Sequence, residues 1–213
     1  MTIAIPHPAL LAIDTAGPRL QLALALEGRV DTLVEEVAKG HAEIIFDRID
    51  ALLARHQLGP DSLSHIAVTS GPGSFTGLRI GLSAARGLGL GLGIPVIGIP
   101  TLVAMSLSGA PDLPLGILVD ARRNEAYVQN FDAPGAPAEA AQILPMAAAR
   151  AHMWADALLL EPKFADIGLM AGFAALADPA LYPPDPTYIR AADAKPQDTR
   201  KIVPRAPLET PAP

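Results

Sequence analysis

The stretch Leu10-Leu-Ala-Ile-Asp-Thr-Ala-Gly-Pro-Arg-Leu-Gln-Leu-Ala-Leu-Ala-Leu26 decides the fold of this 213-residue chain. A short apolar run ends at Asp14, turn residues follow, and hydrophobic residues then alternate up to Leu26. This pattern predicts a buried strand, a tight turn and a second strand that pairs antiparallel with the first.

The segments that follow extend this hairpin into a regular alternation. Periodic patterns predict a third strand around 30–37, helices over 41–57, 76–92 and 101–108, and strands over 66–69 and 94–99. Three strands followed by alternating helices and strands are the order of a ribonuclease-H-like unit, in which an antiparallel hairpin joins a parallel core covered by helices. The sequence therefore predicts an α/β fold.

A second apolar run that ends in an acid, Ile117-Leu-Val-Asp120, echoes Leu11-Ala-Ile-Asp14 at a distance of 106 positions. An alternating strand over 125–131 follows it, as in the first case. Two ribonuclease-H-like units in tandem make the actin-like ATPase (ASKHA) fold, and Ala/Pro-rich segments after this strand indicate a degenerate second unit. We expect an N-terminal lobe over 9–110, a smaller lobe over 111–190 and a Pro-rich, flexible tail over 191–213.

The segment Ser70-Gly-Pro-Gly-Ser-Phe-Thr-Gly77 joins a predicted strand to a predicted helix. Its backbone amides suit an anion at the helix N-terminus, but no Gly-Lys-Ser/Thr follows as in a Walker A loop. The alternative, a tight connection with Ser74 or Thr76 as the helix cap, is the one we favour. A vestigial nucleotide cleft would use Asp14, Thr15, Gly71, Gly73, Ser74 and Asp120.

Small residues recur every four positions along the helix that follows, at Gly77, Gly81, Ala85, Gly89 and Gly93. Interior glycines disfavour a helix by about 0.8–1 kcal/mol each relative to Ala, so packing must compensate for them. Small residues at this spacing let a second helix approach closely. That helix is either 41–57 of the same chain or part of a second subunit, and we favour a role between subunits.

Composition excludes several classes of function. The chain has no Cys, which excludes disulfide scaffolds and cysteine nucleophiles, and its five His lack metal-ligand spacing. Its 16 Lys+Arg against 22 Asp+Glu leave a net charge of −6, which disfavours unaided binding of nucleic acid. Residues 87–111 carry no charge, but their Gly and Pro residues fit turns better than a membrane span. With no secretory signal in view, we expect a cytoplasmic protein.

Asp14 and Asp120 are the acids at strand ends that are expected to converge. In an actin-like ATPase such acids hold magnesium or activate water. The alternative is that each acid caps the turn that follows its strand. We favour turn capping, because the second unit is shortened and no second phosphate loop is evident.

Five segments together resemble the TsaB (formerly YeaZ) family. They are Leu11-Ala-Ile-Asp-Thr15, Ser70-Gly-Pro-Gly-Ser-Phe-Thr-Gly-Leu-Arg-Ile-Gly81, Gly93-Ile-Pro-Val-Ile-Gly98, Asp120-Ala-Arg-Arg-Asn-Glu-Ala-Tyr127 and Pro186-Thr-Tyr-Ile-Arg190. The resemblance runs from about residue 9 to residue 190. It implies an actin-like, two-lobed fold and a non-catalytic subunit of the machinery for tRNA threonylcarbamoyladenosine (t6A).

In that family the subunit forms a heterodimer with TsaD, which transfers threonylcarbamoyl to N6 of adenosine 37 in tRNAs reading codons that begin with A. TsaE joins the complex, and TsaC makes the threonylcarbamoyl-adenylate. The resemblance thus implies that ATP or ADP and magnesium bind to partner subunits and that tRNA is met only through the complex. From the residues themselves we expect no metal and no membrane contact for this chain, and a homodimer through the same helices is a third possibility as a resting form.

In the family the partner surface lies on the first two helices. The resemblance therefore implies contacts from Ile44, Ile45, Arg48, Leu52, Arg79, Ser83 and Arg86, to which the small-residue stripe adds Gly77, Gly81, Ala85 and Gly89. The rival hypothesis is an actin-like ATPase or small-molecule kinase, or a glycoprotease-type enzyme, that uses Asp14 and Asp120.

Overall fold

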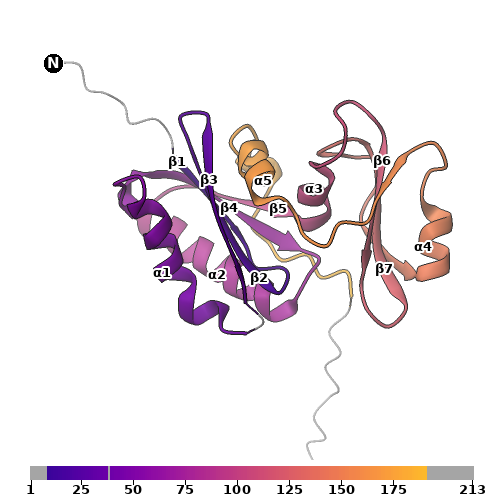
Figure 1. Ribbon diagram of the computed structural model, residues 1–213, viewed down its shortest axis with the longest axis horizontal. Coiled ribbons are helices and arrows are strands. Elements are labelled where there is room, and N and C mark those ends of the chain that lie inside the picture. Colours follow the sequence, from indigo (N-terminus) through magenta and orange to yellow (C-terminus); the bar gives the residue numbers. More distant parts are fainter. Residues whose placement is uncertain (1–8, 38, 191–213) are drawn as a thin grey trace, which may run out of the picture.

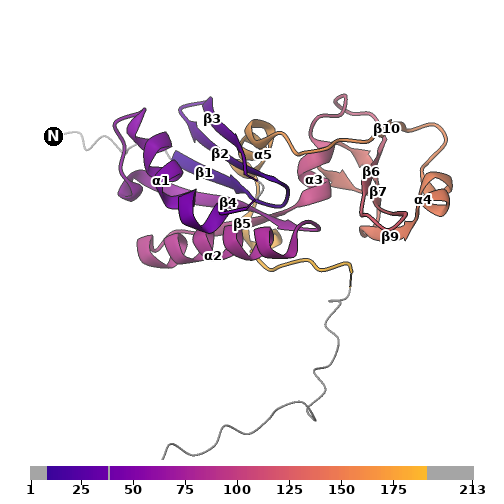
Figure 2. The same ribbon diagram turned by 60° about the horizontal axis from the view of Figure 1, so that its bottom comes forward.

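The computed structural model describes residues 9–37 and 39–190 (Figure 1). Two sheets lie side by side along the long axis of the molecule, with helices α3 (Thr101–Ser106) and α5 (Ile167–Ala174) between them (Figure 2). This arrangement is the two-lobed, actin-like plan predicted from the repeated strand-and-acid pattern.

The first sheet has the strand order β3-β2-β1-β4-β5. Its strands are β1 (Ala9–Asp14), β2 (Arg19–Leu26), β3 (Arg29–Glu36), β4 (Leu63–Gly71) and β5 (Val96–Pro100). Strands β1, β2 and β3 pair antiparallel, whereas β4 pairs parallel with both β1 and β5. The predicted ribonuclease-H-like unit is therefore confirmed.

Helices α1 (His41–Ala54) and α2 (Phe75–Leu92) cover one face of this sheet (Figures 1 and 2). Because side chains alternate along a strand, Leu11 and Ile13 of β1 join the core under α1 and α2, whereas Leu10 and Ala12 join the core under α3 and α5. Strand β1 is buried along its whole length, as its unbroken apolar run predicted. Helix α1 ends three residues earlier than predicted, at Ala54.

The small residues of α2 face the sheet of their own chain. A Cβ on Gly81 would lie 2.4 Å from Thr15 Oγ1, and one on Gly89 would lie 2.3 Å from Val96 Cγ2. A Cβ on Gly77 would lie 2.0 Å from the backbone oxygen of Thr15. The stripe therefore lets α2 approach β1 and β5 closely, and its predicted role between subunits is wrong.

The second sheet is smaller and has the order β10-β6-β7-β8, with β9 also paired to β7. Its strands are β6 (Leu115–Asp120), β7 (Glu125–Ala133), β8 (Ala136–Pro137), β9 (Gln142–Pro145) and β10 (Leu158–Leu160), and α4 (Met146–His152) packs beside it. The hairpin β6–β7 repeats the hairpin β1–β2, but among the described residues the helix-and-strand alternation is not repeated. The second unit is thus degenerate, as predicted.

The chain then returns to the first lobe, which corrects the predicted boundary at residue 190. Helix α5 packs on β1, β2 and β3. Residues 183–190, which we call the strap, run along the β5 side of the sheet. Just before the strap, the Tyr182 carbonyl accepts a hydrogen bond from the Gly98 amide of β5 (2.8 Å). Within the strap, the Thr187 amide donates to the Ser70 carbonyl of β4 (2.7 Å). The second lobe therefore ends before α5, and the predicted tail over 191–213 lies outside the described residues.

Two short 3-10 turns, Pro60–Ser62 and Pro179–Leu181, complete the described structure. None of the helices within 9–37 and 39–190 combines the length and the apolar character needed to cross a membrane.

Candidate functional site

A cavity of about 820 Å³ lies between the two lobes. The ends of β1 and β6, the loop before α2 and the start of α3 contribute to its wall. Four of the predicted cleft residues line it, namely Asp14, Gly73, Ser74 and Asp120. The structure thus brings the two strand-end acids to one cavity, as the tandem plan predicted.

Asp14 is committed to the fold. Its Oδ1 accepts hydrogen bonds from the Ala16 amide (2.9 Å) and the Thr69 hydroxyl (2.8 Å), and its Oδ2 accepts one from the Gln21 side-chain amide (2.7 Å). The residue is only 5% exposed. Both oxygens therefore hold donors of the protein itself, and this carboxylate joins β1, β2 and β4.

Asp120 occupies the equivalent place in the second sheet. Its Oδ1 accepts a hydrogen bond from the Arg122 amide (2.8 Å), two residues on, as Asp14 does from Ala16. The turn continues through Arg122, Arg123 and Asn124, whose φ angles of 66°, 57° and 61° are all left-handed. The predicted turn-capping role is thus confirmed for both acids.

The glycine-rich loop packs against the turn after β1. The Ser74 amide donates to the Ala16 carbonyl (2.7 Å), and a Cβ on Gly73 would lie 2.8 Å from the Ala16 Cβ. Ser74 caps α2, because its hydroxyl accepts a hydrogen bond from the Gly77 amide (3.2 Å). The loop is therefore the tight, capped connection that we favoured.

Two predicted cleft residues lie elsewhere. Thr15 is fully buried, and its hydroxyl donates to the Gly77 carbonyl (2.8 Å). Gly71 lies under the strap, where a Cβ would come within 2.6 Å of the Thr187 carbonyl oxygen. Both residues serve packing instead of the cavity wall.

Sequence reasoning missed the positive charge of the cavity. Lys39, Arg122, Lys163 and Arg190 line it, and Arg190 forms an ion pair with Glu125. The side chains of Lys39 and Lys163 have no hydrogen bond or ion pair with any described residue. These cations come from four separated segments, so local sequence carried no signal for them. Within the described part of the chain no group of three or more His, Asp or Glu side chains could hold a metal ion.

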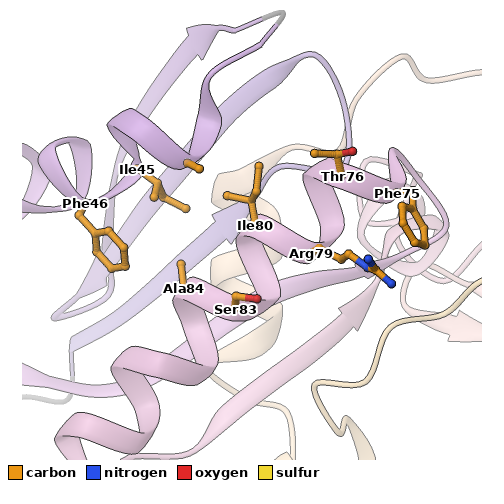
Figure 3. Close-up of a pocket in the computed structure, with 9 residues that line it drawn as sticks. Ile45, Phe46, Phe75, Thr76, Arg79, Ile80, Ser83 and Ala84 are labelled. Carbon is orange, nitrogen blue, oxygen red and sulfur yellow. The ribbon is translucent and has the colours of Figure 1, made fainter. Parts of the chain in front are cut away.

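A second concavity, of about 490 Å³, lies between α1 and α2. It is lined by Ala42, Ile45, Phe46, Phe75, Thr76, Arg79, Ile80, Ser83 and Ala84, and we call it the α1–α2 groove. Figure 3 shows Phe46 and Phe75 towards its two ends, with Ile80 and Ala84 between them. Phe46 and Phe75 are 51% and 45% exposed, so the part of the chain that the structure describes leaves the groove uncovered.

Six of the predicted contact positions are buried inside the first lobe. Ile45 and Leu52 of α1 are 1% and 0% exposed. Gly77, Gly81, Ala85 and Gly89 are the buried small residues of α2 described above. As partner contacts, Leu52 and the four small residues of α2 were wrong, whereas Ile45, although buried, also lines the groove.

The other predicted contact positions lie at the surface or partly buried, namely Ile44, Arg48, Arg79, Ser83 and Arg86. Arg48 is held by Glu35 of β3 through a hydrogen bond of 2.6 Å, and this bond lowers the pKa of Glu35 and raises that of Arg48. Arg86 is held by Asp185 of the strap at 2.6 Å. Arg79 and Ser83 line the groove directly.

The aromatic residues of the groove were not predicted. Phe46 directly follows the buried Ile45, so the helical turn carries it away from the core and outwards. A large apolar residue on the polar side of an amphipathic helix was the signal available in the sequence. Phe75 lies inside the glycine-rich segment, whose pattern predicted a loop and not an exposed aromatic side chain.

Comparisons with known proteins agree with this architecture. The family model described as TsaD, tRNA N6-adenosine threonylcarbamoyltransferase, matches residues 33–142, which are just over half of the chain. The solved structure of YeaZ from Pseudomonas aeruginosa aligns with a TM-score of 0.70 and 22% identity, over 85% of this chain and 99% of that one. The likeness shows that the two chains share a fold.

Several relatives share a higher sequence identity with this chain. The tRNA threonylcarbamoyladenosine biosynthesis protein TsaB of Haemophilus influenzae is 38% identical over 123 residues, which are 55% of this chain and 51% of that protein. The protein of the same name from Escherichia coli is 36% identical, with 52% of its length covered. The chain therefore spans about half the length of these two relatives. An uncharacterized Mycobacterium tuberculosis protein is 35% identical over 201 residues, which are 87% of this chain and 93% of that one. The family model and these relatives together show that the chain belongs to the TsaB (YeaZ) family.

Proposed function

We propose that the chain is a non-catalytic subunit of the t6A machinery and acts by forming a heterodimer with TsaD. The modification is the transfer of threonylcarbamoyl to N6 of adenosine 37 in tRNAs that read codons beginning with A. One observation carries the proposal: the α1–α2 groove presents apolar side chains that none of the described residues, 9–37 and 39–190, covers.

The groove has the composition of a protein-binding site. Complete burial of a fully exposed Phe contributes about 1.5–3 kcal/mol. Phe46 and Phe75 are about half exposed, so each can contribute part of this on binding, beside the apolar Ile80 and Ala84. Exposed apolar surface with polar residues at its edge is typical of sites where another protein binds. A groove between two helices also suits an apolar helix face of the partner.

The state of Asp14 supports a non-catalytic role. An acid that activates water or holds magnesium needs an oxygen free to face it. Asp14 is only 5% exposed, and its two oxygens already accept three hydrogen bonds from this chain. The reacting groups, together with ATP or ADP and magnesium, would then belong to partner subunits.

The remaining partners follow from the same role. TsaE joins the complex, TsaC supplies the threonylcarbamoyl-adenylate, and the net charge of −6 leaves tRNA binding to the other subunits. We further propose that the protein acts in the cytoplasm. When TsaD is absent, two copies of the chain would bind through the same groove as a homodimer.

Sedimentation of the purified chain, of TsaD and of their mixture tests this proposal. We expect a heterodimer, and a Phe46→Asp variant should weaken it at least about tenfold because a charge would enter the apolar groove. Leu176→Asp is the matched control, since Leu176 is 92% exposed and follows α5 away from the groove. Failure of the wild-type chain to bind TsaD would refute the heterodimer.

A second assay addresses the non-catalytic role. The purified chain with ATP and magnesium should show no turnover above a heat-killed control. In a reconstituted reaction with TsaC, TsaD and TsaE, omission of the chain should abolish t6A formation on tRNA. ATP turnover by the chain alone that Asp14→Asn removes would favour the actin-like enzyme instead.

A further inference from the structure

Arg79 differs from the other arginines of α1 and α2. Arg48 is held by Glu35 (2.6 Å), Arg55 by Asp31 (3.3 Å) and Arg86 by Asp185 (2.6 Å). Arg79 has no carboxylate partner within the part of the chain that the structure describes. Its guanidinium instead lies over the Phe75 ring, 4.0 Å from the ring centre. Its charge is thus placed at the groove and left without a counter-charge.

An aromatic pair holds this guanidinium in place. The Phe75 ring packs against the ring of Tyr188 on the strap, with centres 5.2 Å apart. The strap is itself fixed beside α2, because the Thr187 amide donates to the Ser70 carbonyl and Asp185 binds Arg86. Packing of the guanidinium on the ring leaves its N–H groups at the edge of the plane, where they can meet a carboxylate. Arg79 is therefore oriented before any partner arrives.

The position of Arg79 defines what the groove can accept. Arg79 and Phe75 lie at one end of the groove, and Phe46 lies towards the other (Figure 3). A segment that fills the groove buries apolar side chains between these ends and brings one of its residues next to the guanidinium. An arginine that is partly removed from water gains most from a carboxylate, which accepts two parallel N–H donors.

We propose that Arg79, held on the Phe75–Tyr188 pair, is the charged anchor of the α1–α2 groove and receives an Asp or Glu side chain from an apolar helix of TsaD. This inference rests on the proposed function, since it names a contact within the same heterodimer. It goes beyond that function in two ways. It gives the strap a role, since Tyr188 supports Phe75, and it requires an acidic residue on the TsaD helix.

Titration of TsaD with an Arg79→Met variant tests the anchor, since Met keeps an apolar stem and loses the charge. We expect the dissociation constant to rise at least about tenfold and its dependence on salt concentration to decrease. Arg55→Met is the matched control, because Arg55 already binds Asp31 and does not line the groove. It should bind TsaD within about twofold of the wild type.

Two variants of Tyr188 separate orientation from folding. Tyr188→Phe keeps the ring and should bind TsaD like the wild type, whereas Tyr188→Ala should weaken binding without removing its salt dependence. Circular dichroism of each variant shows whether the chain is folded. If the wild type binds TsaD but Arg79→Met binds equally well, or with unchanged salt dependence, the anchor is refuted and the heterodimer stands. If the wild type does not bind TsaD, both proposals are refuted.

Discussion

The side-chain amide of Gln21 donates a 2.7 Å hydrogen bond to the carboxylate of Asp14, and the pair ties the ends of β1 and β2 together beside the interlobe cavity. The same Gln21 amide donates to the Ala165 carbonyl (3.2 Å), which precedes α5. Asp14, the strand-end acid considered for catalysis, is thus linked through Gln21 to the segment that precedes α5 and so helps to hold that segment against the first hairpin.

Replacement of Asp14 should affect stability more than function. In Asp14→Asn the new amide faces the Gln21 amide donor, so we expect the free energy of unfolding to fall by about 1–3 kcal/mol. Asp120→Asn is the control, because Asp120 is exposed and its hydrogen bond from the Arg122 amide remains available to Asn. Urea unfolding measures both. Once folded, Asp14→Asn should still support t6A formation, and loss of activity in an intact complex would contradict the structural role.

Two glycines of α2 should respond in opposite directions to a methyl group. Gly81→Ala places Cβ 2.4 Å from the buried Thr15 hydroxyl, and we expect a loss of about 1–3 kcal/mol in the free energy of unfolding. Gly87→Ala has nothing within 4 Å and should gain about 0.4–1 kcal/mol, because Ala restricts the unfolded chain. Thermal unfolding of the two variants decides the point. Equal effects would mean that α2 does not lie against β1 as described.

A partly buried acid in the second lobe, Glu139, should make stability depend on pH. His152 Nε2 and Glu139 Oε1 are 2.8 Å apart, and the Asn130 backbone amide also donates to Glu139. Burial raises the pKa of Glu139, but these hydrogen bonds together lower it below its ordinary 4.5. Because its pKa is lower in the folded state, Glu139 stabilises the fold above about pH 4.5. This contribution is lost as the pH falls through the pKa of Glu139 in the folded protein.

We therefore expect Glu139→Gln to lose about 1–2 kcal/mol at neutral pH and to match the wild type in acid. Denaturant unfolding at several pH values checks this. Asp50→Asn serves as the reference, because Asp50 is exposed and its side chain forms no hydrogen bond or ion pair with the described residues. A difference that stayed constant below pH 4.5 would contradict the assignment.

The strap should come loose when its contact with β5 is crowded. A Cβ on Gly98 would lie 2.4 Å from the Pro183 carbonyl oxygen and 2.7 Å from Pro184 Cα. In Gly98→Ala we expect faster proteolysis within the strap and about 1–3 kcal/mol less stability. Gly172→Ala has space for its methyl group, so it should neither speed proteolysis nor lower stability. Unchanged proteolysis of Gly98→Ala would show that the strap does not need this contact.

The sequence predicted what depends on local periodicity. The hairpin β1–β2, the helix α2 and the Ser74 cap were all evident, because alternation, apolar spacing and capping chemistry are written in neighbouring residues. The glycine stripe was visible but ambiguous, since close approach to a sheet and close approach to a helix demand the same small residues. Which of the two packs against the stripe depends on β1 and β5, which lie elsewhere in the chain.

Long-range contacts could not be predicted in this way. No local pattern predicts that α5 packs on the first sheet. Nor does one predict the contact between Tyr188 and Phe75, which are more than a hundred residues apart in the chain. For the same reason the positive charge of the cavity was missed. The aromatic residues of the groove were the part that closer attention to the polar side of helix 41–57 would have found.

The return of the chain to its first lobe has a consequence for synthesis. The sheet begun by β1 receives its covering helix α5 only after residue 174 has been made, and its outer edge at β5 receives the strap later still. A ribosome-bound chain that stops after the second hairpin therefore exposes one apolar face of the first sheet. We expect the first lobe not to fold as an expressed fragment that stops at β5, since α5 and the strap, which complete it, follow the second lobe in the chain.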